Sequence, residues 1–429
     1  MVVHKRRRLQ PAHRAARGTI TACAFLLITA WASLLTAGAL EPDRDPARRL
    51  AHDALIVDTH IDAPIRLRAT APAGESPGTA RRGEFDLERA RAGGLDVAFM
   101  SIFVPSSVDE RGGGVAFADG LIDLVESMVA AHPDGFALAT CVEDVSRNRA
   151  AGLISLAMGM ENGGPLAASE DALAHFRARG VRYVTLTHGA PNAFADSSYS
   201  TDRPNGGLSA AGRRLVTRLN DAGLMIDVSH VSDAAFWHVL AASRTPVIAS
   251  HSSARHFVPG FERNMSDEMI EAIARAGGVV QVNFGSGFVT AAARAWAVAR
   301  DAAVLDYLEA EQLTRESPQV RTFTQSFSAT HPYPRATVAD VLDHIEHMIR
   351  LAGVDHVGLG SDFDGVGDTL PVGLEDVAAY PNLVDGLLER GYSEDEIRLV
   401  LGENLLRVWE RVEQHGTTRG HPPECANTT

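Results

Sequence analysis

The sequence predicts an α/β fold, a (β/α)8 barrel of the TIM type, from three observations. Short apolar runs recur along the chain, as expected for strands buried on both faces of a parallel sheet. Helix-like segments separate these runs. Polar side chains that suit metal binding follow most of them. The eight predicted strands span residues 55–59, 97–104, 153–159, 182–187, 224–229, 246–250, 279–284 and 356–361.

The predicted helices alternate with these strands. Several begin with a serine followed by acidic residues, as helix N-termini prefer, and Ser169, Ser232 and Ser266 are examples. Residues 290–335 interrupt the alternation, and we expect a helical insertion with a loop over the barrel mouth. The predicted helices span residues 120–131, 169–179, 209–222, 232–242, 266–276, 338–352, 374–380, 382–390 and 393–412.

The two ends of the chain differ from the barrel domain, residues 41–415. Residues 1–17 are basic, residues 18–40 are uncharged and mostly apolar, and Ala37-Gly38-Ala39 fits a small-residue cleavage site. Residues 1–40 therefore predict a secretory signal peptide. The apolar run is also long enough to span a bilayer, so an uncleaved membrane anchor is the alternative. Both predict an exported protein, periplasmic or extracellular. The polar tail, residues 416–429, is expected to be disordered.

Composition excludes several functions. The formal net charge is −14, although residues 1–40 carry only basic charges, so the body is strongly acidic and nucleic-acid binding is not expected. Lys5 is the only lysine, which excludes a P-loop lysine, a Schiff base or a carbamylated lysine in the body. Cys23 lies in the N-terminal apolar segment, and pairing of Cys141 with Cys425 stays open.

The residues that follow the predicted strands carry the chemistry. In a strand, residues i and i+2 face the same side, so His60 and Asp62 project together from the end of the first strand. In a (β/α)8 barrel the catalytic groups lie at the carboxyl ends of the strands. Six later residues stand at such ends: Glu161, His188, His230, His251, Asn283 and Asp362.

This set predicts a metal-dependent hydrolase. Four histidines, two aspartates and a glutamate exceed what one tetrahedral zinc needs, and two metals sharing a bridging carboxylate use them better. With no lysine available, Glu161 is the natural bridge. Asp362 would accept the proton of the attacking water and pass it to the leaving amine. Neither a Gly-x-Ser-x-Gly motif nor a His-Glu-x-x-His motif is present.

Other polar residues have simpler interpretations. His238, His344 and His347 lie within predicted helices, where surface or packing roles are more common than metal binding. Asp58 and Asp227 lie inside predicted strands and suit support of a ligand histidine.

With these motifs, the sequence resembles the membrane dipeptidase (renal dipeptidase) family of zinc peptidases, from about residue 54 to residue 412. The motifs that carry the resemblance are Asp58-Thr59-His60-Ile61-Asp62, Gly159-Met160-Glu161, Leu186-Thr187-His188, Asp227-Val228-Ser229-His230, Ser250-His251-Ser252-Ser253-Ala254-Arg255, Arg263-Asn264, Gly360-Ser361-Asp362-Phe363-Asp364-Gly365 and Asn404-Leu405-Leu406-Arg407-Val408.

The resemblance implies roles for individual residues in a site with two Zn²⁺ per chain. His60 and Asp62 would hold one zinc, His230 and His251 the other, and Glu161 would bridge them. His188 would contact the substrate and stabilise the oxyanion. Arg263 would pair with the terminal carboxylate of a dipeptide, and Asp362 would bind its free amine and shuttle protons. Asn283 is a further substrate-binding candidate from its position at a strand end.

The expected function is hydrolysis of small dipeptides, including those with a C-terminal D-residue. Two alternatives stay open: an amidohydrolase of N-acyl amino acids or lactams with the same metal site, and a non-catalytic metal-binding barrel. Homodimer formation and N-terminal membrane association are both compatible with the sequence. Asn162 departs from the family, where many members have glycine after the bridging glutamate.

Overall fold

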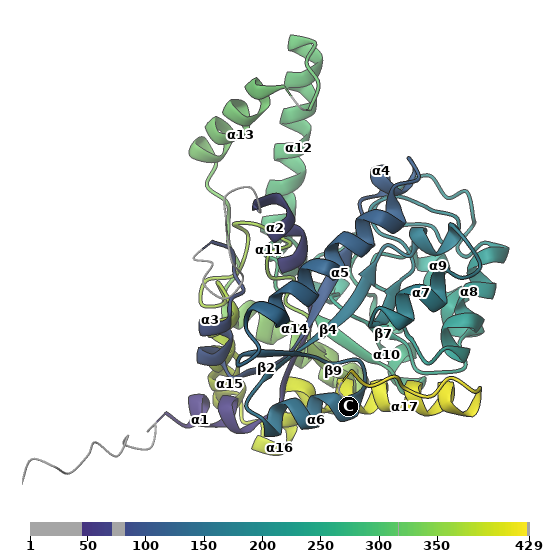
Figure 1. Ribbon diagram of the computed structural model, residues 1–429. Helices are drawn as coiled ribbons and strands as arrows, with labels where there is room; N and C mark the ends of the chain where they lie inside the picture. The colour runs from purple at the N-terminus through teal and green to yellow at the C-terminus, as the bar shows by residue number, and fades with distance from the viewer. Residues whose placement is uncertain (1–44, 71–81, 316, 427–429) are drawn as a thin grey trace, which may run out of the picture. The chain divides into compact units, whose positions relative to one another are not determined.

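Eight parallel strands form a closed barrel surrounded by helices, as the sequence predicts (Figure 1). The computed structural model describes residues 45–70, 82–315 and 317–426. The predicted signal or anchor segment, residues 1–40, lies outside the described residues. The barrel strands are β1 (Ile56–Ile61), β2 (Leu95–Phe103), β4 (Ile154–Glu161), β5 (Val181–Thr185), β6 (Met225–Asp227), β7 (Ile248–Ala249), β8 (Val279–Val282) and β9 (Val357–Leu359).

The strand order explains how the barrel closes. β9 pairs with both β8 and β1, and β2 pairs with both β1 and β4. The longest register runs from Val97 opposite Ser155 to Phe103 opposite Glu161. A short extra strand, β3 (Phe136–Leu138), pairs with the first residues of β4. The sequence does not predict β3, because three residues are too few to show a strand period.

The interior of the barrel is filled by large side chains and covered at one end by the C-terminal helix. Phe99, Tyr183 and Trp409 form one buried cluster in which the ring centroids of Phe99 and Trp409 lie 5.2 Å apart. Trp409 belongs to α17 (Asn404–Thr418), which runs across the lower side of the barrel in Figure 1. The carboxyl ends of the strands therefore form the open end, where the site lies.

Helices alternate with the strands. The remaining long and short helices are α1 (Pro46–Asp53), α2 (Ala63–Thr70), α3 (Leu87–Gly93), α4 (Ser106–Asp109), α5 (Gly114–Ala131), α6 (Val142–Ala150), α7 (Ala172–Ala178), α8 (Ala210–Asp221), α9 (Asp233–Ala242), α10 (Asp267–Arg275), α11 (Ser286–Val289), α12 (Ala291–Glu311), α13 (Pro318–Thr330), α14 (Val338–Ala352), α15 (Tyr380–Glu389) and α16 (Glu394–Arg398).

Local sequence accounts for most helix starts. The hydroxyls of Ser232 and Ser266 accept hydrogen bonds from backbone N–H groups in the first turns of α9 and α10. Ser169 does not cap a helix, since α7 begins only after Asp171. The predicted helix 374–380 is wrong: only a 3-10 turn, Val377–Ala379, precedes α15.

The predicted helix 393–412 is divided. A π-helical turn, Leu399–Glu403, separates α16 from α17. Gly402 lies in this turn, where an added Cβ would stand 2.6 Å from the carbonyl oxygen of Leu55. The glycine therefore lets the turn pack directly on the residue before β1.

Two helices occupy the segment that interrupts the alternation. α12 and α13 extend away from the barrel at its open end (Figure 1). α12 buries only Ala293 and Val304, and α13 buries no residue. The rings of Tyr307 and Phe323 stack between them, with centroids 4.4 Å apart.

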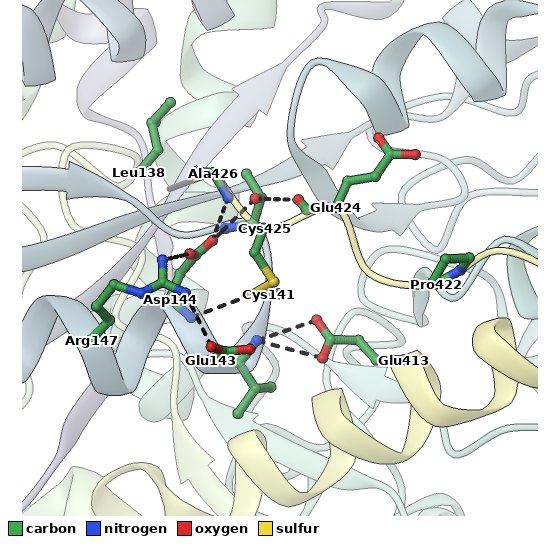
Figure 2. Close-up of a disulfide and its surroundings, with 12 residues drawn as sticks. Leu138, Cys141, Glu143, Asp144, Arg147, Glu413, Pro422, Glu424, Cys425 and Ala426 are labelled. Atoms are coloured by element: carbon green, nitrogen blue, oxygen red, sulfur yellow. Dashed lines mark hydrogen bonds and ion pairs between the residues drawn. A yellow bond between two sulfur atoms is a disulfide. The ribbon is translucent and has the colours of Figure 1, made fainter. Parts of the chain in front are cut away.

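The expectation of a disordered tail is wrong for residues 416–426. α17 continues to Thr418, and a disulfide joins Cys425 to Cys141 at the start of α6 (Figure 2). The backbone N–H of Ala426 donates to Asp144, and the guanidinium of Arg177 pairs with Glu424. Polar contacts and a covalent bond therefore hold a segment that has no apolar pattern of its own.

None of the helices in the described part of the chain combines the length and apolar character needed to cross a membrane.

Candidate metal centre

The polar side chains predicted from strand ends converge at the open end of the barrel. His60 and Asp62 come from the end of β1, and Glu161 is the last residue of β4. Four of the loops after the later strands bring one residue each, namely His188, His230, His251 and Asp362. All are buried except His188, which is partly exposed.

Glu161 stands between His60 on one side and His230 and His251 on the other. Its Oε2 lies 3.4 Å from Nε2 of His60. Its Oε1 faces the other group, at 3.1 Å from Nε2 of His230 and 3.4 Å from Nε2 of His251. The two oxygens of one carboxylate therefore face different sets of imidazole nitrogens, as a bridging ligand requires.

Three overlapping groups of side chains have ligand atoms close enough to hold a metal ion. Within each group these atoms lie within 4.8 Å of one another. The groups are His60, Glu161 and His251; Glu161, His188 and His230; and His60, Asp62 and Asp362.

Tyr183 orients His60 from across the barrel. Its hydroxyl donates to the carbonyl oxygen of Thr59 and lies 2.8 Å from Nδ1 of His60. The hydroxyl therefore accepts the Nδ1–H of His60, which directs the lone pair of Nε2 at Glu161 and Asp62. Gly159 makes room for this ring, since an added Cβ would overlap it.

His251 is oriented through a serine. Its Nδ1 lies 2.7 Å from Oγ of Ser250, and that hydroxyl donates to Asp227 at 2.7 Å. Asp227 also accepts from the backbone N–H of Ser229 and of Ser250. This series of hydrogen bonds fixes the ring that presents Nε2 of His251 to Glu161.

Asp58 ties the first and last strand ends together. It accepts from the backbone N–H of His60 and of Ser361, each at 3.0 Å, and from the hydroxyl of Tyr380 at 2.6 Å. Burial raises the pKa of Asp58. The loop that carries Asp362 is thereby held beside β1.

The pKa shifts of His230, His251 and Glu161 suit metal binding. Burial, followed by repulsion from nearby cations such as Arg263, lowers the pKa of His230 and of His251 well below the ordinary value. Although burial opposes it, attraction to His60 and His188 holds the pKa of Glu161 well below its usual range. Neutral imidazoles and an ionised carboxylate are the forms that bind metals.

Unpartnered buried atoms provide a second test of the fit. Nε2 of His60 and Oδ1 of Asp62 are buried and lack a hydrogen-bond partner within the described residues. Burial opposes protonation of His60, but Tyr183 and the carboxylates of Glu161 and Asp62 raise its pKa well above the ordinary value. The site thus attracts positive charge, and its nitrogen and oxygen donors suit Zn²⁺, Mn²⁺ or Co²⁺.

Arg263 lies buried behind the histidines. It donates from Nη1 to Oγ of Ser252 and from Nη2 to the carbonyl oxygen of His251, both at 2.8 Å. Its Nη2 is also 3.1 Å from Nε2 of His230, while its Nε has no partner in the described part of the chain. The contact with His230 and metal binding by the same nitrogen exclude each other.

Asn283 supports Asp362. Its Nδ2 donates to Oδ2 of Asp362 at 2.7 Å, and its Oδ1 accepts from the N–H of Gly285. Burial, together with repulsion from Asp62, raises the pKa of Asp362 to about 8. Asn283 itself does not line the cavity described next.

A cavity of about 370 Å³ opens directly over these groups. Its polar lining includes Glu161 and Asp362 on the floor and His188 at the edge. Its apolar wall consists of Ile65, Phe103, Tyr199, Phe288 and Val366. A volume of this size admits a small molecule rather than a folded chain.

His188 stands at the edge of this cavity. Its Nε2 lies 3.5 Å from Oε1 of Glu161, and its ring packs 4.6 Å from the ring of Phe103 and 4.2 Å from that of His230. Burial lowers the pKa of His188, which favours the neutral ring, and a neutral ring has one N–H to donate to a bound molecule.

The departure at Asn162 has a local explanation. Its φ is 73°, a left-handed conformation that glycine adopts freely and asparagine tolerates. Its Nδ2 donates to the carbonyl oxygen of Val104, and its Oδ1 accepts from the N–H of Gly164. Asparagine therefore keeps the turn after Glu161.

Sequence reasoning named the polar groups but missed the residues that orient them. The structure brings together every predicted strand-end ligand, and Asp58 and Asp227 take the supporting positions considered for them. It also adds Tyr183, Ser250 and Tyr380. A tyrosine or serine gives no signal of such a contact in the sequence, because the partner lies on a distant segment of the chain.

Known proteins resemble this chain over most of its length. A family model described as membrane dipeptidase (peptidase family M19) matches residues 44–421. An uncharacterized dipeptidase of Schizosaccharomyces pombe is 33% identical over 388 residues, covering 85% of this chain and 82% of that protein. The dipeptidase aclJ of Aspergillus oryzae is 34% identical over 338 residues, covering 77% and 70%.

Solved structures show the same fold. The probable dipeptidase PvdM from Pseudomonas aeruginosa superposes with a TM-score of 0.74 at 29% identity, covering 86% of this chain and 98% of that one. A metallo peptidase from Rhodobacter sphaeroides, liganded with a phosphinate mimic of the dipeptide L-Ala-D-Ala, gives a TM-score of 0.68 at 27% identity, covering 84% and 99%.

Proposed function

The chain belongs to the membrane dipeptidase family of metallopeptidases, and on that basis we propose that it is an exported binuclear zinc enzyme. It hydrolyses the peptide bond of small dipeptides. The substrates include dipeptides with a C-terminal D-residue.

The position of Glu161 carries the binuclear proposal. Its Oε2 faces His60, and its Oε1 faces His230 and His251. His60 and Asp62 would hold one zinc ion, His230 and His251 the other, and Glu161 would contribute one oxygen to each. A single tetrahedral ion would leave part of this set without a function.

Zinc, when bound, would lower the pKa of a water molecule so that it ionises near neutral pH and can attack a peptide carbonyl. The residues of the chain then position the substrate and move protons. Bound zinc would favour the ionised form of Asp362. Asp362, on the cavity floor and held by Asn283, is then placed to take a proton and deliver it to the departing amine. His188, at the cavity edge, is placed to donate to the developing oxyanion.

The two ends of a dipeptide have opposite charges, and the site has a partner for each. Asp362 suits the free amine. Arg263 suits the carboxylate, since its Nε is unpartnered and metal binding by His230 releases its Nη2. Recognition of both ends limits the substrate to two residues, in keeping with the cavity volume of about 370 Å³.

Two further parts of the proposal rest on separate observations. A relative of this fold binds a mimic of L-Ala-D-Ala, which supports acceptance of a C-terminal D-residue. The Cys141–Cys425 disulfide suits an oxidising compartment and supports export through residues 1–40. Periplasmic or extracellular location, with or without an N-terminal anchor, follows from that proposal.

The test measures metal content and hydrolysis together. Purified residues 41–429 would be assayed with L-L and L-D dipeptides, with the same dipeptides N-acetylated, and with their C-terminal amides. We expect two zinc ions per chain and turnover of free dipeptides only.

Two results would contradict the proposal. Turnover restricted to N-acetylated substrates would assign the chain to another amidohydrolase activity and remove Asp362 as the amine partner. One bound ion in the fully active protein would refute the bridging role of Glu161.

A further inference from the structure

A second cluster of metal-ligating side chains lies outside the cavity. His256, Asp267 and His347 come from three different elements: the 3-10 turn Arg255–Phe257, the first residue of α10, and α14. One ligand atom from each lies within 4.8 Å of the other two. None of the three residues lines the cavity over Glu161.

The contacts within the cluster define its chemistry. Nε2 of His347 lies 2.8 Å from Oδ1 of Asp267. The ring of His256 stacks on that of His347, with centroids 4.3 Å apart and planes inclined by 21°. His347 is buried, Asp267 is partly exposed and His256 is exposed. One side of the cluster therefore faces solvent.

We infer that His256, Asp267 and His347 form a peripheral site for a divalent transition-metal cation, separate from the metal centre in the cavity. Two imidazoles and one carboxylate suit Zn²⁺, Ni²⁺ or Cu²⁺, and water completes the coordination on the exposed side. This inference does not depend on the proposed substrate.

The hydrogen bonds show what the cation replaces. Arg350 can only donate, so its contact of 3.4 Å leaves Nδ1 of His347 as the acceptor. Nε2 of His347 then carries the proton and donates it to Asp267. Binding exchanges that proton for the cation, and a rotation of the exposed His256 side chain supplies the third ligand.

The proposed cation site lies on the loop that carries Arg263. Residues 254–265 form a loop closed by backbone hydrogen bonds from Arg255 to Met265 and from Met265 to Ser253. His256 lies near its start and Arg263 near its end. A cation held by His256, α10 and α14 therefore fixes the loop that places the Arg263 guanidinium.

The test uses the full chain without an affinity tag, with its zinc centre loaded and free metal removed. Ni²⁺ binding would be followed by calorimetry, by zinc and nickel content after dialysis, and by melting temperature. We expect one Ni²⁺ beyond the resident zinc and a nickel-dependent rise in melting temperature.

Three variants make the assignment specific. His256→Ala and Asp267→Asn should each lower the affinity for the additional Ni²⁺ by at least about tenfold. Mutating even a residue that only hydrogen-bonds to a metal ligand typically lowers metal affinity by about 10–100-fold. His175→Ala is the matched control. His175 and Asp119 form a pair with the same 2.8 Å separation, and no third ligand joins them among the described residues.

The inference is overturned by any of three results. These are no additional Ni²⁺ in the wild-type chain, displacement of the resident zinc instead of additional binding, or unchanged Ni²⁺ affinity in His256→Ala. His256 is exposed, so its replacement leaves the fold intact and the comparison stays interpretable.

Discussion

The hydroxyl of Tyr183 on β5 lies 2.8 Å from Nδ1 of His60 on β1, across the interior of the barrel. The contact leaves Nε2 of His60 free and directed at the carboxylates of Glu161 and Asp62. A side chain buried beneath the cavity thus sets the direction of a metal ligand within it.

Removing this hydroxyl should weaken metal binding. We expect Tyr183→Phe to lower the affinity for zinc by about 10–100-fold, because His60 loses the partner that fixes its tautomer and orientation. Competition with a metal chelator measures the affinity. Tyr392→Phe, at a half-buried tyrosine near the end of α15, is the control and should have no effect. Equal zinc affinity in both variants would contradict the orienting role of Tyr183.

Replacing Arg263 by lysine should weaken substrate binding more than turnover. Lysine keeps the charge but not the planar fork that pairs with a carboxylate. A lost charged hydrogen bond of about 1.5–3 kcal/mol predicts a rise in KM for dipeptides of about 10–100-fold. Dipeptide amides lack the carboxylate and serve as the reference substrates. A similar loss with amides would show that the guanidinium only supports His230 and His251.

Asp362→Asn should lower kcat without removing metal. The amide is nearly isosteric but cannot accept a proton, and proton transfer by a positioned side chain is worth about 10²–10⁴-fold. Metal content of the variant separates this loss from damage to the centre, because Asp362 also lies within reach of His60 and Asp62. Loss of zinc in the variant would identify Asp362 as a ligand.

The pH dependence of stability should include a contribution from His344, far in sequence from the metal ligands. Its Nδ1 accepts from the N–H of Ala254 and its Nε2 donates to the carbonyl oxygen of Val289, so the neutral ring is satisfied. Burial lowers its pKa to about 4. The unfolded chain therefore binds more protons between about pH 6.5 and pH 4, and stability falls as the pH falls through that range.

A shift of this size corresponds to about 3 kcal/mol at the acid end of the range. His344→Gln can keep one acceptor and one donor without titrating. Urea unfolding at pH 7 and pH 4.5 compares the variant with the wild-type chain. The wild-type chain should lose more stability on acidification, and parallel losses in both proteins would rule out this contribution.

Reducing the disulfide should destabilise the fold but spare the site. Cys141 and Cys425 are 284 residues apart, and the chain-entropy account gives an upper value of about 6 kcal/mol for such a loop. Cys425→Ser should lower the melting temperature to that of the reduced wild-type protein. Dipeptide hydrolysis below the melting temperature should stay unchanged, and a matching loss of activity would contradict this separation.

The sequence predicted the place of a site residue correctly where that place depends on a single strand. His60, Asp62 and Glu161 stand at the ends of apolar runs, and parallel strands bring their carboxyl ends to one edge of the sheet. Position in the chain therefore predicted position in the site. The helical insertion lies where the alternation breaks, although its two helices, α12 and α13, were not separated in advance.

Contacts between distant strands could not be predicted in this way. Tyr183 looks like any core residue of a buried strand, and its partner His60 lies 123 residues away. The tail was misjudged for the same reason, since Cys425 and Glu424 contact residues near 140–182. Polar composition indicated disorder, while the stabilising groups belong to another part of the chain.

The pairing of β9 between β8 and β1 has a consequence for the order of assembly. β1 carries His60 near the start of the chain, but one of its edges has no partner until residues 357–359 have been made. Asp362, α17 and Cys425 come later still. An N-terminal fragment that lacks β9 therefore cannot form the complete site. Metal binding has to follow synthesis of nearly the whole polypeptide, and it takes place in the compartment where the barrel closes.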